Sequence, residues 1–422
     1  MGNEIIYNRE AKEIQFIGKI TSFIFYTQLF DALRNHYKEN GIKKIPVFSF
    51  VYVDYFEPLV VPNLVGIGKI INQIHNREKV PLRFAQIYST KFLDNIGFFT
   101  NVGDPQIYLE EIHVVEHGRL LQKHIPQKRG LSIYDFDSRY LGFYNNQKEQ
   151  EFYNLEHKIR VYPDDSFNYY SVFIDTNSTE EELDAIRTNK YNSLTPFVKI
   201  HFENILSKIN DPIQTKTILK VLTEIICNSV LYSGSFCAAM LQARTIAYVC
   251  SQCGNKTLEW DEICPICNEQ ETIVPQKSIT ISISDIGVGF EYSFEKKKEK
   301  FGKEYRDVFN QFSEQEQAKY NNYLYIFEAL QFSKKKRDED NRNNLYTLLQ
   351  DIVMNNDGKM RIHYIDTQVV FNSKRCNQCK KIEPIKCSHC LLKAQKQNIQ
   401  ESPVRFFKSK FQGIHIEVEL NF

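Results

Sequence analysis

The chain has 422 residues, enough for two or three domains with hydrophobic cores of their own. Apolar residues make up 42% and charged residues 25% of the chain, which is typical of globular proteins. The 53 Lys and Arg residues balance 52 Asp and Glu residues, so no overall field attracts nucleic acid or an acidic membrane surface. No apolar run is long enough to cross a membrane and no signal peptide is evident. We therefore expect a cytoplasmic protein that is not bound to a membrane.

The first 110 residues have the pattern of a small α/β domain. Strands and helices alternate in the expected order, at 45–53, 61–75, 80–88 and in a short helix from Ser89. Gly66 and Gly68 fall within the first helix pattern. They are too isolated to form a phosphate-binding loop, so we interpret them as packing residues.

A mixed, polar stretch at 111–190 follows, which we predict to be a connector that contributes a strand or two. Apolar patterning returns in the third segment, 191–422. Helices are predicted at 193–209 and 222–235, and strands at 237–249, 278–285 and 411–420. The sequence thus predicts an α/β protein with two folded domains.

Eight of the ten cysteines form Cys-x-x-Cys pairs, and only Cys227 and Cys237 stand outside them. One set spans 250–267 and the other 376–390. Their members are Cys250, Cys253, Cys264 and Cys267, and Cys376, Cys379, Cys387 and Cys390. Each pair places two thiolates on one tight turn, and two pairs complete a tetrahedral shell around zinc. Disulfides or unligated thiols are the alternatives, which a cytosolic chain disfavours. We expect two structural zinc sites, built as β-hairpin insertions.

The predicted helix at 222–235 is apolar but carries two polar side chains on one face. Glu224 and Asn228 are four residues apart, so they lie one turn above the other. Further along, Asp285 ends a predicted strand, and Gly287 and Gly289 follow it. Glycines at this spacing let a backbone turn tightly and approach a ligand closely.

The Glu-x-x-x-Asn helix, the two strands and the Asp-x-Gly-x-Gly turn together resemble the GHKL ATPase superfamily. This superfamily includes gyrase, MutL, a heat-shock chaperone, histidine kinases and anti-sigma-factor kinases, and "VLTEIICNSVLYSGS" is most similar to the last branch. The resemblance covers roughly 191–422 and implies helices layered on one mixed sheet.

The resemblance also implies roles for individual residues. Asn228 would coordinate the Mg²⁺ that bridges the ATP phosphates, and Asp285 would accept a hydrogen bond from the adenine amino group. Gly287 and Gly289 would let the chain pass close to the base. Glu224 would orient and deprotonate the attacking water. Oxygen ligands suit magnesium, and a carboxylate can take the proton of an in-line water.

The predicted N-terminal domain is similar to a STAS domain, the antagonist fold on which anti-sigma-factor kinases act. Glu57, Pro58 and Leu59 stand where that family carries its phosphorylatable serine or threonine. We therefore expect a docking surface here that senses the nucleotide state of its neighbour, and no phosphorylation switch.

The segment between the predicted turn and the last strands departs from the superfamily. No glycine-rich box precedes "LYTLLQDIVM". Contacts to phosphate could come from nearby cations, or these could form a solvated charged run; they are Lys334, Lys335, Lys336, Arg337 and Arg342. The pair Ser313 and Glu316 predicts a helix-capping box, and Gly358 is predicted to end the later helix.

These features predict a Mg-ATP-binding switch with weak ATP hydrolysis. The STAS-like domain and the zinc-binding elements would couple its ATP site to a protein partner or to a second copy in a homodimer. One alternative is a serine/threonine protein kinase of the anti-sigma-factor kind. Another is a non-catalytic module whose basic zinc ribbons bind nucleic acid or protein. Glu224 favours an ATPase or kinase, because a vestigial site has no use for a buried carboxylate. No transducer domain follows the last predicted strand, which argues against a machine of the gyrase or MutL type.

Overall fold

The computed structural model describes a large part of the chain in two α/β units. The described residues are 2–75, 80, 82–83, 115–116, 119–120, 167–175, 199, 206, 212–233, 236–250, 256–257, 273–302, 304–340, 344–372, 382–395 and 402–421.

The N-terminal domain is a mixed four-stranded sheet with two helices, in the strand order β1-β2-β3-β4. The first two strands pair antiparallel as a hairpin, and the remaining pairs are parallel. Its elements are β1 (Glu4–Asn8), β2 (Glu13–Ile20), α1 (Ser22–Asn40), β3 (Val47–Phe56), α2 (Val60–Ile74) and β4 (Leu82–Arg83). The predicted first strand and first helix are confirmed as β3 and α2. Of the second predicted strand the structure describes only β4 and residue 80, and the predicted helix at Ser89 lies outside the described residues.

Helix α1 was not predicted, although its sequence carries clear signals. The side chain of Thr21 accepts a hydrogen bond from the Ile24 amide at 3.3 Å and so caps the helix. Phe25, Leu29 and Leu33 recur at a spacing of four and are buried on one face. The helix therefore forms because a cap and an apolar stripe coincide.

The second sheet is antiparallel, in the order β11-β12-β10-β8-β7, with the short β9 paired to β8. Its strands are β7 (Phe167–Asp175), β8 (Phe236–Cys250), β9 (Lys256–Thr257), β10 (Ile273–Asp285), β11 (Lys359–Asn372) and β12 (Val404–Asn421). The expectation of a mixed sheet in this domain is wrong for the described strands. The described strands pair antiparallel throughout, β8 with β7 and β10, and β12 with β10 and β11, and such pairs need none of the crossover connections of parallel strands.

The edge strand β7 lies within the stretch that was predicted to be a connector. The same stretch contains β5 (Val115–Glu116) and β6 (Arg119–Leu120), which pair with each other. The predicted strands at 237–249, 278–285 and 411–420 are confirmed as parts of β8, β10 and β12.

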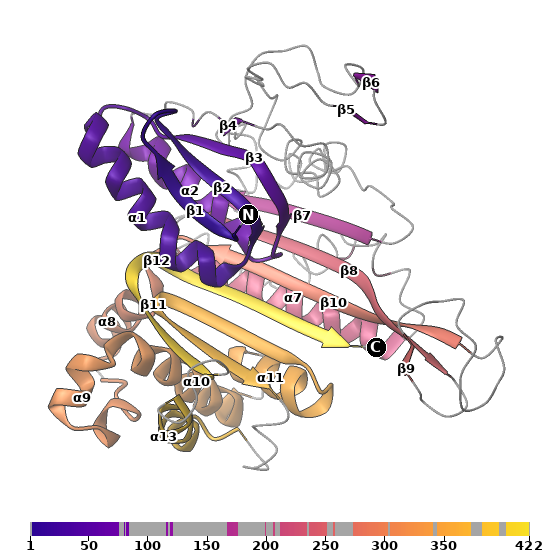
Figure 1. Ribbon diagram of the computed structural model, residues 1–422. Coiled ribbons are helices and arrows are strands. Elements are labelled where there is room, and N and C mark those ends of the chain that lie inside the picture. The colour runs from indigo at the N-terminus through magenta and orange to yellow at the C-terminus, as the bar shows by residue number, and fades with distance from the viewer. Residues whose placement is uncertain are drawn as a thin grey trace, which may run out of the picture.

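Helices cover one face of the antiparallel sheet (Figure 1). They are α7 (Pro212–Ser233), α8 (Gly289–Phe301), η5 (Phe309–Gln311), α9 (Glu314–Lys319), α10 (Asn321–Asp340), α11 (Leu345–Gln350), the π-helical η6 (Asp351–Asn355) and α13 (Pro384–Gln395). The predicted capping box is confirmed, because the hydroxyl of Ser313 accepts from the Glu316 amide while the Glu316 carboxylate accepts from the Ser313 amide. The predicted helix end at Gly358 is two residues late: η6 is capped at Asn356 and Asp357 takes the left-handed conformation, while the Gly358 amide donates back to the Ile352 carbonyl.

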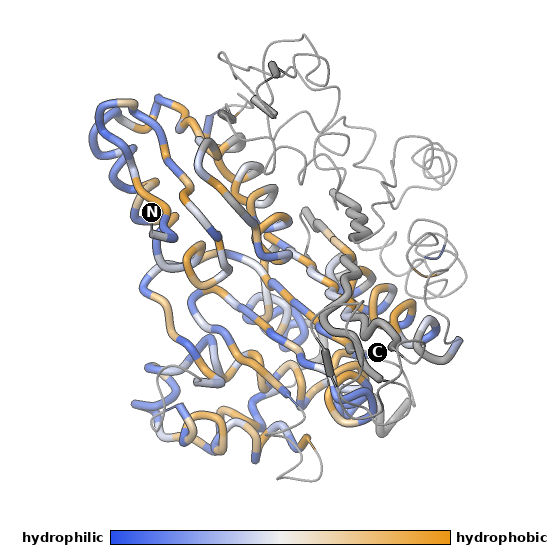
Figure 2. Tube along the Cα trace, turned by 45° about the vertical axis from the view of Figure 1, so that its right-hand side comes forward, coloured by the Kyte–Doolittle hydropathy of each residue, from blue (hydrophilic) through white to orange (hydrophobic). Residues whose placement is uncertain are grey.

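The N-terminal domain covers the opposite face of the same sheet, so the molecule has layers on both sides of it (Figure 1). Helix α1 contacts β12, and α2 contacts β8 and β10. Most of the coloured part of α2 is orange in Figure 2, the colour of hydrophobic residues. The N-terminal core is continuous with four residues of the second unit, namely Met240, Ile286, Phe407 and Phe411. In the described part of the chain, no helix has the length and apolar character that crossing a membrane requires.

Candidate functional site

Glu224 and Asn228 lie on α7 as predicted, one turn apart. Helix α7 packs its apolar face on the sheet, where Ile225 contributes to the same core as Ile281 of β10. Glu224 is only 1% exposed, whereas Asn228 is half-buried. The two positions are separated by about 6 Å along the helix axis. A carboxylate and an amide thus share the inner part of the helical layer.

Asp285 is the last residue of β10 and is 3% exposed. It pairs with Cys237 on β8 and with Ile414 on β12. Because β8 begins three residues after α7 ends, Asp285, which pairs with Cys237 near the start of β8, lies at the same end of the sheet as the C-terminus of α7. The fold therefore brings the C-terminal half of α7 and the Asp-x-Gly-x-Gly turn to one end of the sheet.

The turn after Asp285 is held by its own side chain. The Gly287 amide donates a hydrogen bond to Oδ1 of Asp285 at 2.6 Å, and both residues are buried. Gly289 has φ +76°, a conformation that favours glycine, and it begins α8. A Cβ at Gly289 would come within 2.5 Å of the Tyr364 ring. Gly289 therefore has a packing role in addition to any close approach to a ligand.

Tyr364 also caps the helix that follows the turn. Its hydroxyl accepts a hydrogen bond from the Glu291 amide at 3.1 Å, in the first turn of α8. Burial raises the pKa of Tyr364, so the hydroxyl stays protonated across the physiological range. The start of α8 is thus tied to β11.

Gly413 on β12 supports the turn from the neighbouring strand and was not identified from the sequence. It has φ +102°, and a Cβ there would overlap the backbone carbonyl of Asp285. The only signal for this residue is the pairing of Asp285 with Ile414, which is a property of the sheet register.

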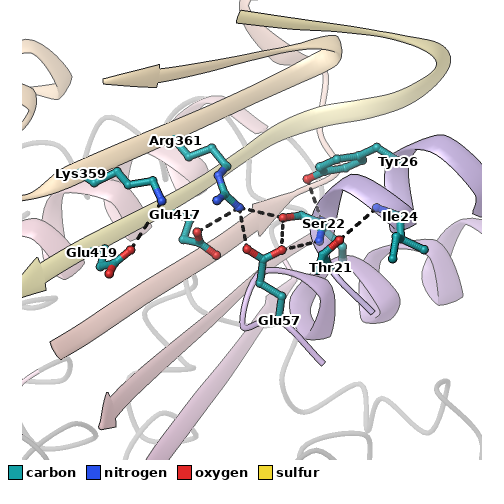
Figure 3. Close-up of polar contacts among 10 residues, drawn as sticks. Thr21, Ser22, Ile24, Tyr26, Glu57, Lys359, Arg361, Glu417 and Glu419 are labelled. Atoms are coloured by element: carbon teal, nitrogen blue, oxygen red, sulfur yellow. Dashed lines mark hydrogen bonds and ion pairs between the residues drawn. The ribbon is translucent and has the colours of Figure 1, made fainter. Parts of the chain in front are cut away.

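An ionic cluster joins the N-terminal domain to the antiparallel sheet (Figure 3). Nη1 of Arg361 on β11 lies 3.0 Å from Oε1 of Glu57 and 3.1 Å from Oε1 of Glu417 on β12. The same nitrogen donates to Oγ of Ser22 at 2.8 Å, and Ser22 in turn donates from its amide and its hydroxyl to Oε2 of Glu57. The carboxylate of Glu57 thus joins the N-terminal domain to β11 of the antiparallel sheet.

The two carboxylates of this cluster titrate differently. Burial acts to raise the pKa of Glu57, but the charge of Arg361 and the hydrogen bonds from Ser22 outweigh it and lower that pKa below its ordinary value. Burial raises the pKa of Glu417 to about 7, although Arg361 acts in the opposite direction. The cluster therefore takes up a proton on Glu417 near neutral pH.

Aromatic stacking surrounds the cluster. The ring of Tyr26 on α1 stacks on His363 of β11, with centroids 3.7 Å apart and planes within 4°. Phe411 stacks on His415 at 4.2 Å. Burial lowers the pKa of His363 to about 3, so this imidazole is neutral at physiological pH. The interface is thus assembled from neutral rings around one buried ionic group.

The cysteine pairs are described in part. Cys387 and Cys390 lie on α13, one turn apart, so the second pair of that set stands on a helix and not on the predicted hairpin. Cys250 ends β8. The other predicted ligands lie outside the described residues; they are Cys253, Cys264, Cys267, Cys376 and Cys379. Among the residues that are described, no three metal-binding side chains gather into a group.

The cations considered as phosphate ligands make other contacts where their side chains are described. Lys334 forms an ion pair with Glu383, and Lys335 forms one with Asp307. Both pairs join α10 to neighbouring segments of the helical layer. The side chain of Arg337 and all of Arg342 lie outside the described residues. These contacts favour a structural use of Lys334 and Lys335 over phosphate binding.

A cavity of about 550 Å³ opens elsewhere, between α8, the junction of α9 with α10, and a bulge in β11. Asp366 lies in its wall and accepts hydrogen bonds from Asn322 at 2.8 Å and from Thr367 at 2.9 Å. The neighbouring Ile365 has φ +57°, which is strained for a β-branched residue. None of the predicted nucleotide ligands is among the lining residues of this cavity.

Comparison of the chain with protein-family models, with curated proteins and with solved structures finds no match in any of the three.

Proposed function

We propose that this protein binds Mg-ATP at the end of the antiparallel sheet where α7 and the Asp285 turn meet, and that it acts as a nucleotide-dependent switch with weak ATP hydrolysis. The observation that carries the proposal is the burial of two carboxylates, Glu224 on α7 and Asp285 at the end of β10, in neighbouring layers of the same fold. A few polar groups in apolar surroundings are typical of ligand-binding sites, so these two carboxylates support a site in this part of the fold.

The residues at this place fit the proposed ligand chemically. Asp285 offers carboxylate oxygens as acceptors, of which Oδ1 already orients the Gly287 amide. Asn228 offers an amide oxygen of the kind that Mg²⁺ accepts. When bound, Mg²⁺ would neutralise the phosphate charge. Glu224, one turn away and almost fully buried, is the base that would take a proton from an attacking water.

In this proposal the N-terminal domain responds to the nucleotide state of the site. The N-terminal domain packs on the face of the sheet opposite to α7, and Ile286, next to Asp285, belongs to its core. A change in the Asp285 turn would therefore act on the docked domain without a separate transmission element. The kinase alternative, in which phosphate passes to a partner, uses the same site and is distinguished by its product.

Zinc is proposed as a second, structural cofactor. Eight cysteines suffice for two four-thiolate sites, and the helix-borne pair Cys387 and Cys390 has the one-turn spacing that lets two thiolates hold one ion. Elemental analysis should give about two zinc ions per chain. A value below one in zinc-replete protein would contradict this proposal.

The nucleotide proposal is tested by thermal melting with and without Mg-ATP. Mg-ATP should raise the melting temperature of the wild type, because it binds the folded state preferentially. Asp285→Asn should remove that shift, since the amide can still accept from Gly287 but can present a donor to the adenine amino group. Asp31→Asn is the matched control, because Asp31 is exposed on α1 and pairs only locally with Arg34. The proposal fails if the wild type shows no shift, or if Asp285→Asn keeps the full shift.

A further inference from the structure

Helix α2 of the N-terminal domain packs directly on the Asp285 turn, and Gly66 is the point of contact. A Cβ at Gly66 would lie 2.7 Å from Cγ2 of Ile286, with Oγ of Ser284 and Cζ of Phe411 next at 3.6 and 3.7 Å. A real Cβ does not approach another carbon this closely. The missing side chain at Gly66 is therefore what lets α2 lie against the turn.

Ile286 connects the turn to the N-terminal core. Its side chain is 5% exposed and packs with the N-terminal residues, whereas Ile283, on the strand just before the turn, belongs to the core of the helical layer. Ile286 stands between Asp285 and Gly287, whose hydrogen bond shapes the turn. Because peptide units are rigid, Ile286 cannot shift without moving Asp285 or Gly287.

The turn is held on its other sides by the sheet. Gly413 of β12 lies against the Asp285 carbonyl, and the ring of Tyr364 lies against Gly289. These contacts come from the same unit as the turn, while the contact at Gly66 comes from the other unit. The N-terminal domain therefore adds a constraint on the position of Asp285 that comes from outside the unit of the turn.

We propose that seating of α2 at Gly66 sets the affinity of the site for the adenine nucleotide, which makes Gly66 and Ile286 positioning residues of that site. This inference rests on the proposed nucleotide function. Coupling of this kind is reciprocal, so bound nucleotide would also favour the docked arrangement of the N-terminal domain. The N-terminal domain is then the regulator of the site within the same chain.

The inference is tested by calorimetric titration of Mg-ATP into wild type, Gly66→Ala, Ile286→Leu and the double variant. Gly66→Ala should raise Kd about fivefold or more, in the usual range of coupling between sites. Alanine favours helix over glycine, so weaker binding would not reflect a weakened α2. Leucine keeps the volume of isoleucine but lacks the Cγ2 methyl that meets the new Cβ. The double variant should therefore return to within about twofold of the wild-type Kd.

Ile14→Val serves as the matched control for general loss of stability. Ile14 is fully buried on β2 in the same N-terminal core, and its truncation lowers the melting temperature without adding an atom near the turn. Its Kd should stay at the wild-type value. Melting curves of all variants establish that each is folded at the temperature of the titration.

The outcomes distinguish nucleotide binding itself from its coupling to Gly66. If wild type binds no Mg-ATP, the proposed function and this inference both fall. If wild type binds and Gly66→Ala binds equally well, only the coupling is overturned. The coupling is also overturned if Ile14→Val weakens binding as much as Gly66→Ala, or if the double variant is not restored. If Gly66→Ala does not fold, the coupling is tested by the Kd of the double variant. A wild-type Kd in the double variant supports compensation by Ile286→Leu, and a raised Kd contradicts the coupling.

Discussion

Arg361 on β11 and Glu57, just before α2, form an ion pair with a distance of 3.0 Å between Nη1 and Oε1. The two residues are 304 positions apart in the sequence, and their ion pair joins the two units. Both side chains are largely buried, with exposed fractions of 14% and 22%. The same guanidinium forms a second ion pair with Glu417. One arginine thus compensates two carboxylates at the domain interface.

Replacing Arg361 should destabilise the protein strongly. Arg361→Met keeps most of the side-chain volume but leaves Glu57 and Glu417 without their cation, which costs about 3 kcal/mol for a buried pair. Lys359→Met is the control two residues away on β11, because Lys359 pairs with Glu419 at 3.6 Å with both side chains about a third exposed. That change should cost about 0–1 kcal/mol. Urea unfolding measures the free energy of unfolding of both variants. Equal decreases in the two variants would contradict a larger contribution from the buried cluster.

The pH dependence of stability should carry the signature of Glu417. Its pKa rises from 4.5 in the unfolded chain to about 7 in the fold. Between these values the folded state binds more protons than the unfolded state, so the free energy of unfolding falls as pH rises from about 4.5 to 7. Glu57 has a lowered pKa, so its contribution is lost only at lower pH, as the pH falls below its ordinary value.

Glu417→Gln isolates this effect because glutamine stays neutral at every pH. Relative to wild type, the variant should gain stability as pH rises from about 5 to 7, and the difference should level off above pH 7. Melting temperatures of the two proteins over pH 5–8 give the comparison. A difference that is independent of pH would mean that Glu417 titrates outside this window.

Gly413 should tolerate no side chain. Gly413→Ala combines a strained φ of +102° with overlap of the Asp285 carbonyl, so strand β12 or the turn must move. Gly302→Ala is the matched control: its φ is +60°, but a Cβ there meets nothing within 4 Å. The control should cost about 1–2 kcal/mol from backbone strain alone, and Gly413→Ala clearly more. Similar losses of unfolding free energy in both variants would contradict the close approach.

Local patterns predicted the elements whose signals lie within a few residues. The alternation of three isoleucines with serine and threonine residues over 278–284 predicts β10, and the Ser313–Glu316 pair predicts the start of α9. Helix α1 could have been predicted in the same way from Thr21 and its apolar spacing. Predicting these elements requires only the residues within and next to each of them.

Relationships between distant segments could not be predicted from such patterns. The contact of Arg361 with Glu57, and that of Gly413 with Asp285, exist only because the sheet register and the docking of α2 bring them together. Arg361 and Gly413 carry no signal in their own neighbourhood of the sequence, and nothing near Glu57 or Asp285 indicates these partners. Glu224, Asn228 and Asp285 were singled out because their pattern in the sequence resembles that of the GHKL ATPase superfamily, and their role stays a prediction.

The last prediction separates binding from chemistry on α7. Glu224→Ala should leave Mg-ATP bound but lower turnover about 100-fold or more, because a general base acts only when water attacks. Asn228→Ala should weaken binding of Mg-ATP itself, since its oxygen would contact the metal in the ground state. Glu224 is almost fully buried, so Glu224→Gln is included to keep the volume and the packing of the helix. Phosphate release and calorimetric Kd are measured for all three, with melting curves as the control for helix integrity. If Glu224→Gln hydrolyses ATP at the wild-type rate, another residue is the base. If wild type releases no phosphate and transfers none to a partner, Glu224 has no chemical role, and a switch that responds to nucleotide binding alone is the better description.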